Sequence, residues 1–472
     1  MAREPGPEAP IPLLLELNRG FESGGTNGAW ERLQEVWRQI GGGALKRVSE
    51  DFATGELSFD KVKELVTDDQ SPDTGASTAL HRVWPDFPVH PLINESAHTV
   101  KADTARRAFD SCGEKIVWAV IDSGISKEHA HFQAHPGLHA ETLGGEDAEG
   151  GKIEDLHHDF TGGQSPLTDE KGHGTHVAGI IAGGLPAAFA DRGKHSARVF
   201  REATDASGER GRMVEQNGID SSGLRGMAPA AKLVSLKVIE SGADEEVRDG
   251  RLLEAIQWVR DRNGTGAGFR IHGVNISIGH DFPARWYGAG YSPLCQAVDM
   301  LVRSGVVVVV AAGNSGYGIL TRADEETTHT VLQATINDPG NTERAITVGS
   351  THRTMPHSYG ISYFSSKGPT GDGRYKPDLV APGERIVSCA TGKNRPAGLS
   401  DCCHAYTEGT GTSMAAPHVS GAIAAFLSSQ REFIGDPDRV KKIFMESATP
   451  LGRSRYFEGA GLLDLMRALQ SI

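Results

Sequence analysis

Three short segments carry side chains that together could break an acyl bond. Asp122 ends an apolar run, His173 stands between two glycines, and Ser413 lies in a Gly-Thr-Ser-Met sequence. A serine hydroxyl is a weak nucleophile at neutral pH, so it needs a base within hydrogen-bond reach and a third group that holds this base in one tautomer. Asp, His and Ser side chains supply these parts, and the sequence therefore predicts a nucleophilic serine site.

The chain also offers two donors for the negative charge that forms on a substrate carbonyl oxygen. The apolar run from Met414 to Phe426 predicts a helix, with Pro417 expected in its first turn, where a missing N–H costs little. A helix N-terminus presents free N–H groups and positive potential, so the Ser413 amide can serve as one donor. Asn314, in an Ala-Ala-Gly-Asn-Ser-Gly sequence, is the candidate for a second donor from a side chain.

The elements that must position these residues follow an α/β pattern. Short, wholly apolar runs alternate with helical segments, which predicts strands covered on both faces. The fold class is therefore α/β, a doubly wound, mostly parallel sheet with helices on both faces. Asp122 and Asn314 follow two of the strands, at the sheet edge where ligand sites form. The expected strands are 116–121, 233–239, 274–278, 306–312 and 346–348, and the expected helices are 252–260 and 294–303.

Residues before about 100 have a different pattern. A strand, a helix, further strands, a second helix and a last strand predict a small α+β unit of ferredoxin-like type. The polar segment at about 185–222 has little periodicity and is expected to be a partly ordered surface loop. The predicted divisions are a flexible N-terminus at 1–11, a small domain at 12–92, a linker at 93–112, and a large domain at 113–472 with an insertion at about 185–222.

Composition narrows the classes of partner. The 472 residues carry a formal net charge of −13, which argues against a general nucleic-acid or anionic-membrane surface. The early apolar stretch 11–15 is too short for a secretion signal, and the run 306–312 is far below a membrane span. Five cysteines do not make a disulfide framework in a chain of this length. We therefore expect free thiols, a cytoplasmic protein, and no nucleic-acid or membrane partner.

The segments around Asp122, His173 and Ser413 resemble those of the subtilase family of serine peptidases in their order and in their flanking residues. The resemblance extends over roughly residues 113 to 466. The resemblance implies a subtilisin-like serine endopeptidase that hydrolyses polypeptides through an acyl-enzyme intermediate. It implies that Asp122, His173 and Ser413 form the catalytic triad, and that Asn314 and the Ser413 amide form the oxyanion hole. Further matching segments are 225–229, 274–279, 364–369, 376–383 and 459–464.

The resemblance also implies a substrate cleft. The acids of segment 243–247 suggest a preference for Lys or Arg two to four residues before the scissile bond, with an ordinary solvated charge cluster as the alternative. The residues implied to bind substrate are Ser277, Ile278, Gly279, Ala311, Ala312 and Gly313, with Ile336 or Asn337 near the bottom of the primary specificity pocket.

Residues 12 to about 92 resemble the inhibitory propeptide of the family, whose tail occupies the cleft. This implies a self-inhibited zymogen with a processing zone in 87–99, and a permanent accessory domain is the alternative. Family members commonly bind calcium, but His131 stands where a carboxylate ligand is usual. Asp220 matches another ligand position. We expect no cofactor for catalysis and no calcium at His131, and leave calcium sites elsewhere open.

Several other residues could suggest chemistry. His176 lies one turn after His173, and we interpret it as a packing residue because no acidic general base separates the two histidines. Asp169 and His129 are treated as neighbours of the site only. Cys402, Cys403 and the histidine after them are interpreted as a loop with free thiols, because a complete metal-ligand set is missing.

Two other classes of function compete with the peptidase. The first is a binding protein that keeps the subtilase shell without turnover, against which the intact triad and Asn314 count. The second is an esterase or a peptide ligase that uses the same nucleophile. Ligation differs from hydrolysis only in whether an amine or water resolves the acyl-enzyme, which the motifs do not decide.

Overall fold

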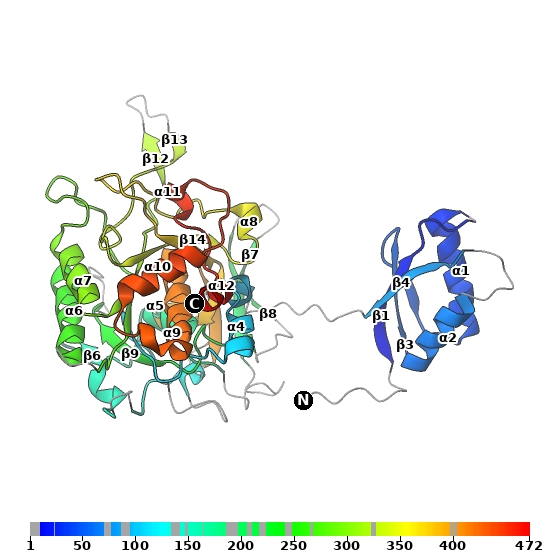
Figure 1. Cartoon of the computed structure of the whole chain (residues 1–472), viewed down its shortest axis with the longest axis horizontal. Coiled ribbons are helices and arrows are strands. Elements are labelled where there is room, and N and C mark those ends of the chain that lie inside the picture. The colour runs from blue at the N-terminus through cyan, green and yellow to red at the C-terminus, as the bar shows by residue number, and fades with distance from the viewer. Residues whose placement is uncertain are drawn as a thin grey trace. The chain divides into compact units, whose positions relative to one another are not determined.

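The computed structural model divides into two units, Met1–His90 and Pro91–Ile472, and each is described by itself (Figure 1). The residues that the structure describes are 10–22, 24–69, 77–85, 95–133, 142–146, 150–163, 165–185, 197–204, 210–216, 223–240, 248–264, 268–321, 327–396, 399 and 404–472.

The smaller unit is a four-stranded antiparallel sheet with two helices. Its sheet order is β2-β3-β1-β4, and alternate residues of β1, such as Leu13, Leu15 and Leu17, are buried in the core. This order confirms the predicted ferredoxin-like arrangement. The elements are β1 (Ile11–Leu17), α1 (Gly25–Gln39), β2 (Leu45–Arg47), β3 (Phe52–Leu57), α2 (Phe59–Asp69) and β4 (Leu80–Pro85).

The larger unit is built on a seven-stranded sheet whose order is β15-β14-β11-β10-β5-β9-β6. Every neighbouring pair in this sheet is parallel. All five predicted strands lie in the sheet, so the predicted α/β class is confirmed. The strands are β5 (Val117–Asp122), β6 (His158–Asp159), β9 (Lys232–Lys237), β10 (Gly273–Ile276), β11 (Val307–Ala311), β14 (Ile346–His352) and β15 (Leu379–Glu384).

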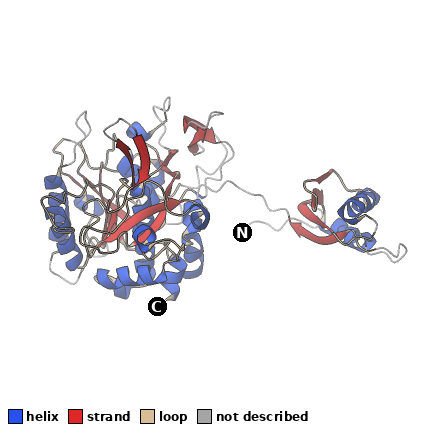
Figure 2. Cartoon of the chain, turned by 90° about the horizontal axis from the view of Figure 1, so that it is seen from above, coloured by secondary structure: helices blue, strands red, loops and turns tan. Residues whose placement is uncertain are grey.

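Helices cover both faces of this sheet, as Figure 2 shows from above. On β5, Trp118 and Val120 pack in the core with α5 and α9, whereas Val117, Ala119 and Ile121 pack in the core with α6 and α7. This double coverage explains why the central strands are rich in apolar residues on both faces. The covering helices are α5 (His173–Ile181), α6 (Asp249–Asn263), α7 (Pro293–Arg303) and α9 (Thr412–Ser429), and further helices are α8 (Pro356–Tyr359), α10 (Pro437–Ser447), α11 (Arg455–Glu458) and α12 (Leu465–Gln470).

The sheet changes its winding direction at β5. From β5 the chain continues to β6 and β9 on one side, and then crosses to β10, β11, β14 and β15 on the other side. Ligand sites in open α/β sheets form at such a switch, beyond the carboxyl ends of the strands. Asp122 ends β5 and Ser277 directly follows β10 at this point.

The predicted linker at 93–112 is wrong for the part that the structure describes. Residues 95–112 contain α3 (Glu95–Thr99) and α4 (Ala102–Phe109). The small side chains of Ala97, Ala102 and Ala105 are buried in the core of the larger unit. Because these alanines fit closely packed helices but give little apolar contrast, the sequence pattern concealed them.

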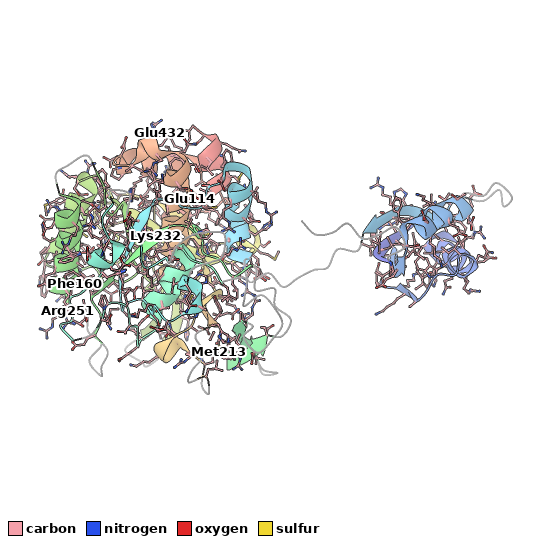
Figure 3. All side chains as sticks on the ribbon, turned by 90° about the horizontal axis from the view of Figure 1, so that it is seen from below. Glu114, Phe160, Met213, Lys232, Arg251 and Glu432 are labelled. Carbon is pink, nitrogen blue, oxygen red and sulfur yellow. The ribbon has the colours of Figure 1, made fainter. Side chains whose placement is uncertain are left out.

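The predicted insertion at 185–222 is also more ordered than expected. Its described parts form a hairpin of β7 (Arg198–Thr204) and β8 (Arg210–Gln216). β7 extends a second sheet in parallel with β17 (Ala405–Gly409), which pairs with β16 (Ile386–Cys389). Met213 of β8, labelled in Figure 3, packs against a small core cluster that includes Phe200. Charged residues at 198, 201 and 202 hid these strands.

A second hairpin, β12 (Tyr317–Thr321) with β13 (Thr327–Val331), begins three residues after Asn314 and stands at the top of the larger unit in Figure 1. Among the helices that the structure describes, none is both long and apolar enough to cross a membrane.

Candidate active site

Asp122 and His173 meet where β5 ends and α5 begins. Alternation along β5 places Asp122 on the same face as Trp118 and Val120, which is the face that α5 covers. The His173 Nδ1 atom lies 2.8 Å from Asp122 Oδ1 and 3.0 Å from Oδ2. Gly174 allows this approach, because a Cβ there would lie 2.3 Å from the Gly124 carbonyl oxygen.

The surroundings of His173 favour its protonated form. Burial of the imidazole lowers its tendency to bind a proton, but the Asp122 carboxylate outweighs burial by charge attraction and hydrogen bonding. The pKa of His173 is therefore raised above its ordinary value. Asp122 itself is fully buried, and its Oδ1 also accepts from the Ser123 amide at 2.7 Å.

Asp169, which sequence reasoning treated as a neighbour only, holds the start of α5. Its carboxylate accepts from the Gly172 amide at 2.8 Å and from the Thr175 amide at 2.8 Å. It also accepts from the Ser123 hydroxyl at 2.9 Å, and this hydroxyl in turn accepts from the Gly174 amide at 2.9 Å. Asp169 is thus a positioning residue that joins the strand of Asp122 to the helix of His173. An Asp shortly before a helix start was the available signal.

Ser413 is the second residue of α9, and two contacts hold it to the end of β10. Its hydroxyl donates to the Ser277 carbonyl oxygen at 2.8 Å, and its own carbonyl oxygen accepts from the Ser277 hydroxyl at 3.1 Å. The sequence pattern predicts Pro417 in the first turn of this helix, and this prediction is wrong, because Pro417 is the sixth residue of α9. Because proline has no N–H, it leaves the Ser413 carbonyl without its usual helical donor, and the Ser277 hydroxyl takes that role.

Asn314 is fixed by its side-chain oxygen. Asn314 Oδ1 accepts from the Thr412 amide at 2.9 Å and from the Thr412 hydroxyl at 3.1 Å. With Oδ1 held in this way, Nδ2 is the side-chain atom of Asn314 that can donate a hydrogen bond. The Thr412 hydroxyl also accepts from the Gly313 amide at 3.1 Å. Thr412 is therefore a positioning residue for Asn314 that sequence reasoning missed, because its contacts cross 98 residues of chain.

The residues implied to bind substrate lie at adjacent strand ends. Ser277, Ile278 and Gly279 follow β10, and Ala311 ends β11 just before Ala312 and Gly313. Asn337 lies against the second of these segments, since its backbone N–H donates to the Ala312 carbonyl oxygen at 3.0 Å and a Cβ on Gly313 would lie 2.4 Å from its side-chain oxygen. Ile336 is buried beside it.

Both ring nitrogens of His131 are already in contact with oxygen atoms of the protein. Its Nδ1 lies 3.0 Å from the Tyr406 hydroxyl, and its Nε2 lies 3.2 Å and 3.1 Å from the carbonyl oxygens of Gly179 and Ala182. Burial lowers the pKa of His131 to about 3, so the ring is neutral. A neutral ring that already occupies these carbonyl oxygens does not fit a calcium site, which needs several free oxygen ligands.

The other residues singled out by sequence lie apart from the reacting groups or outside the described residues. His176 is buried, with Nε2 3.1 Å from the Thr407 carbonyl oxygen, and burial lowers its pKa to about 4. His129 is buried against the Ala405 carbonyl oxygen at 2.8 Å. Segment 243–247, Asp220, Cys402 and Cys403 lie outside the described residues. Among the described residues, no group of three His, Cys, Asp or Glu side chains could hold a metal ion.

Comparison with known proteins places this geometry in a family context. The model of the subtilase family matches residues 113–462. The serine protease AprX of Bacillus subtilis is 28% identical over 439 residues, which cover 91% of this chain and 81% of AprX. Subtilisin DY of Bacillus licheniformis is 28% identical over 371 residues, which cover 79% of this chain and 96% of the relative. Among solved structures, the CspB protease of Clostridium perfringens matches with a TM-score of 0.54 and 18% identity, and covers 80% of this chain and 98% of its own, which shows a shared fold.

Proposed function

The chain belongs to the subtilase family and is a subtilisin-like serine endopeptidase, and from this premise we propose that Asp122, His173, Ser413 and Asn314 carry out its reaction. The observation that carries the proposal is the contact of Asp122 with His173 Nδ1 at 2.8 Å, together with a serine at the start of α9, the helix that packs against the helix of His173. The substrate is a polypeptide.

The proposed reaction begins with a rotation of the Ser413 side chain. Its hydroxyl turns from the Ser277 carbonyl oxygen toward His173, and His173 Nε2 takes the proton as Oγ attacks the substrate carbonyl carbon. Asp122 stabilises the imidazolium that forms. His173 then gives the proton to the leaving amine, and water attacks the acyl-enzyme by the same steps in reverse to release the acid.

The negative charge on the attacked carbonyl oxygen is expected to be held by Asn314 Nδ2 and the Ser413 amide. Both donors are set before substrate binds, since Thr412 fixes the Asn314 side chain and α9 fixes the Ser413 backbone. Preorganised donors of this kind stabilise the transition state more than the ground state.

Asn314→Ala is therefore expected to lower kcat by about 100- to 1000-fold with little change in KM. Thr412→Val, which removes one of the two bonds that fix Asn314, should lower kcat by roughly tenfold, because Thr412 N still donates to Asn314. Thr412→Ser keeps the hydroxyl and is the matched control. Steady-state kinetics on one fluorogenic peptide test all three variants. A loss that appears mainly in KM for Asn314→Ala would contradict the assigned role.

We also propose that the smaller unit is an inhibitory propeptide, so that the chain is made as a self-inhibited zymogen with its own N-terminal segment in the cleft. The N-terminal residues form a compact unit of their own, and Ala97 of α3 is buried in the core of the larger unit. These two observations support a processing bond that lies after residue 85 and before residue 95. We propose that catalysis needs no cofactor and that the enzyme has no nucleic-acid or membrane partner. The unpaired thiols of Cys112, Cys295 and Cys389 support a reducing, cytoplasmic setting.

Mass analysis of the purified protein tests the zymogen proposal. The wild-type chain is expected to be cut once between residues 85 and 95, and the Ser413→Ala variant is expected to stay intact because it cannot form the acyl-enzyme. A wild-type chain that cleaves peptides fully while uncut would show a permanent accessory domain. A cut at the same bond in Ser413→Ala would show processing by another protease.

A further inference from the structure

Three hydrogen bonds connect the Ser413 region, the segment 277–281 and the segment 314–315 into a closed ring. On one side, Ser413 Oγ contacts the Ser277 carbonyl oxygen, and the chain runs on to Asp281. On the other side, Thr412 holds Asn314, and the chain continues to Ser315. The two sides meet where the Ser315 hydroxyl donates to Asp281 Oδ1 at 3.1 Å.

Asp281 is held in place at the far side of this ring. The His280 and Asp338 backbones exchange two hydrogen bonds, of 3.0 and 2.9 Å, which fix the chain directly before it. The Asn337 side chain donates to Asp281 Oδ1 at 3.4 Å. Neutral donors thus orient the carboxylate from two sides.

The charge of Asp281 has no cationic partner within the described residues. His280, its neighbour, pairs with Asp249 through Nε2 at 3.3 Å. The nearest groups around the ring, on Ser277, Ser315, Asn337 and Ser366, are uncharged. Asp281 is exposed, so its carboxylate is open to a ligand.

The carboxylate lies within reach of a long side chain on the bound substrate. One Cα–Cα step, the serine side chain and the 3.1 Å hydrogen bond place Asp281 Oδ1 within about 9 Å of the Asn314 Cα atom. A substrate residue whose carbonyl carbon sits at Ser413 Oγ is next to Asn314 as well. A lysine or arginine side chain spans roughly 6–7 Å from Cα to its charged end. The two charges can therefore meet across the ring.

We propose that Asp281 is a specificity-determining residue that selects lysine or arginine on the acyl side of the scissile bond. This inference rests on the proposed function, since it names the substrate class of that same site. The carboxylate attracts a cationic side chain and repels an acidic one, while Ser315 and Asn337 hold it in position.

Two peptides that differ only at this residue, lysine in one and norleucine in the other, test the proposal. The wild-type enzyme is expected to show a kcat/KM for lysine up to about fivefold above that for norleucine, as for an exposed charge pair. Asp281→Asn should bring the ratio to about one or below. Asp281→Lys should lower kcat/KM for the lysine peptide. In a second pair of peptides, the same variant should show a higher kcat/KM with glutamate at this position than with glutamine. Asp261→Asn, an exposed α6 residue with the same change in charge, should leave the ratio unchanged.

The outcomes separate the inference from the proposed function. A wild-type enzyme that prefers norleucine, or an Asp281→Asn variant that loses activity equally on both peptides, overturns the role of Asp281. A wild-type chain that cleaves neither peptide after removal of the N-terminal unit, and whose Ser413 does not react with a fluorophosphonate, overturns the proposed function instead.

Discussion

Replacement of Ser413 by alanine is expected to lower kcat by about a million-fold. The substitution removes the only atom that can form the acyl-enzyme in the proposed reaction. It leaves the helix start, the Asp122–His173 pair and the Asn314 donor in place. Rates of peptide hydrolysis measured over days, with substrate above KM, resolve a loss of this size.

A matched control lies at the other end of the same helix. Ser429→Ala also removes one hydroxyl from α9, but its Oγ contacts only the Phe109 carbonyl oxygen at 3.5 Å among the described residues. This variant should keep wild-type kcat. Thermal unfolding followed by circular dichroism should show that both variants are folded. A folded Ser413→Ala enzyme with more than about a hundredth of wild-type kcat would contradict the nucleophile assignment.

Asp122→Asn is expected to lower kcat by about ten-thousand-fold. The side-chain amide of asparagine can donate to His173 Nδ1, which would force the imidazole proton onto Nε2, the atom that must accept the Ser413 proton. The variant also loses the charge that stabilises the imidazolium. The Ser123 amide, which donates to Asp122 Oδ1, can still donate to the asparagine oxygen, so the fold at this point should survive.

The pH dependence of the same two enzymes gives a second readout. His173 acts as a base only when neutral, and its pKa is raised, so activity should be present at high pH and fall as the pH drops through the raised pKa. The acid limb of kcat/KM for the wild type should therefore have its midpoint above the 6.5 of a free histidine. In Asp122→Asn this midpoint should move to lower pH, because burial of His173 remains while the attraction is gone. An acid limb that does not move in Asp122→Asn would show that Asp122 does not raise the pKa of His173.

The local environments of the candidate residues could be predicted from sequence because each lies in a short, local segment. Asp122 ends an apolar strand, and Ser413 stands two residues after Gly411 at a helix start, so each environment is visible within about ten residues of chain. The strand pattern also predicts the parallel sheet, since double coverage by helices favours near-continuous apolar runs.

The supporting contacts could not be predicted, because they join segments far apart in the chain. Thr412 and Asn314 are separated by 98 positions, and Ser277 and Ser413 by 136. Pro417 was assigned to the wrong turn because the helix begins one residue before Ser413. Where charge or small size masks periodicity, as in β7 and α4, the elements themselves escaped prediction.

The most direct test of the proposed site is covalent labelling with a fluorophosphonate, after removal of the N-terminal unit, followed by peptide mass mapping. We predict one adduct per chain, on Ser413. The adduct should be absent from Ser413→Ala and should form far more slowly in His173→Ala, which lacks the base. An adduct on any other residue, or none on a folded chain that still cleaves peptides, would contradict the assignment of Ser413 as the nucleophile.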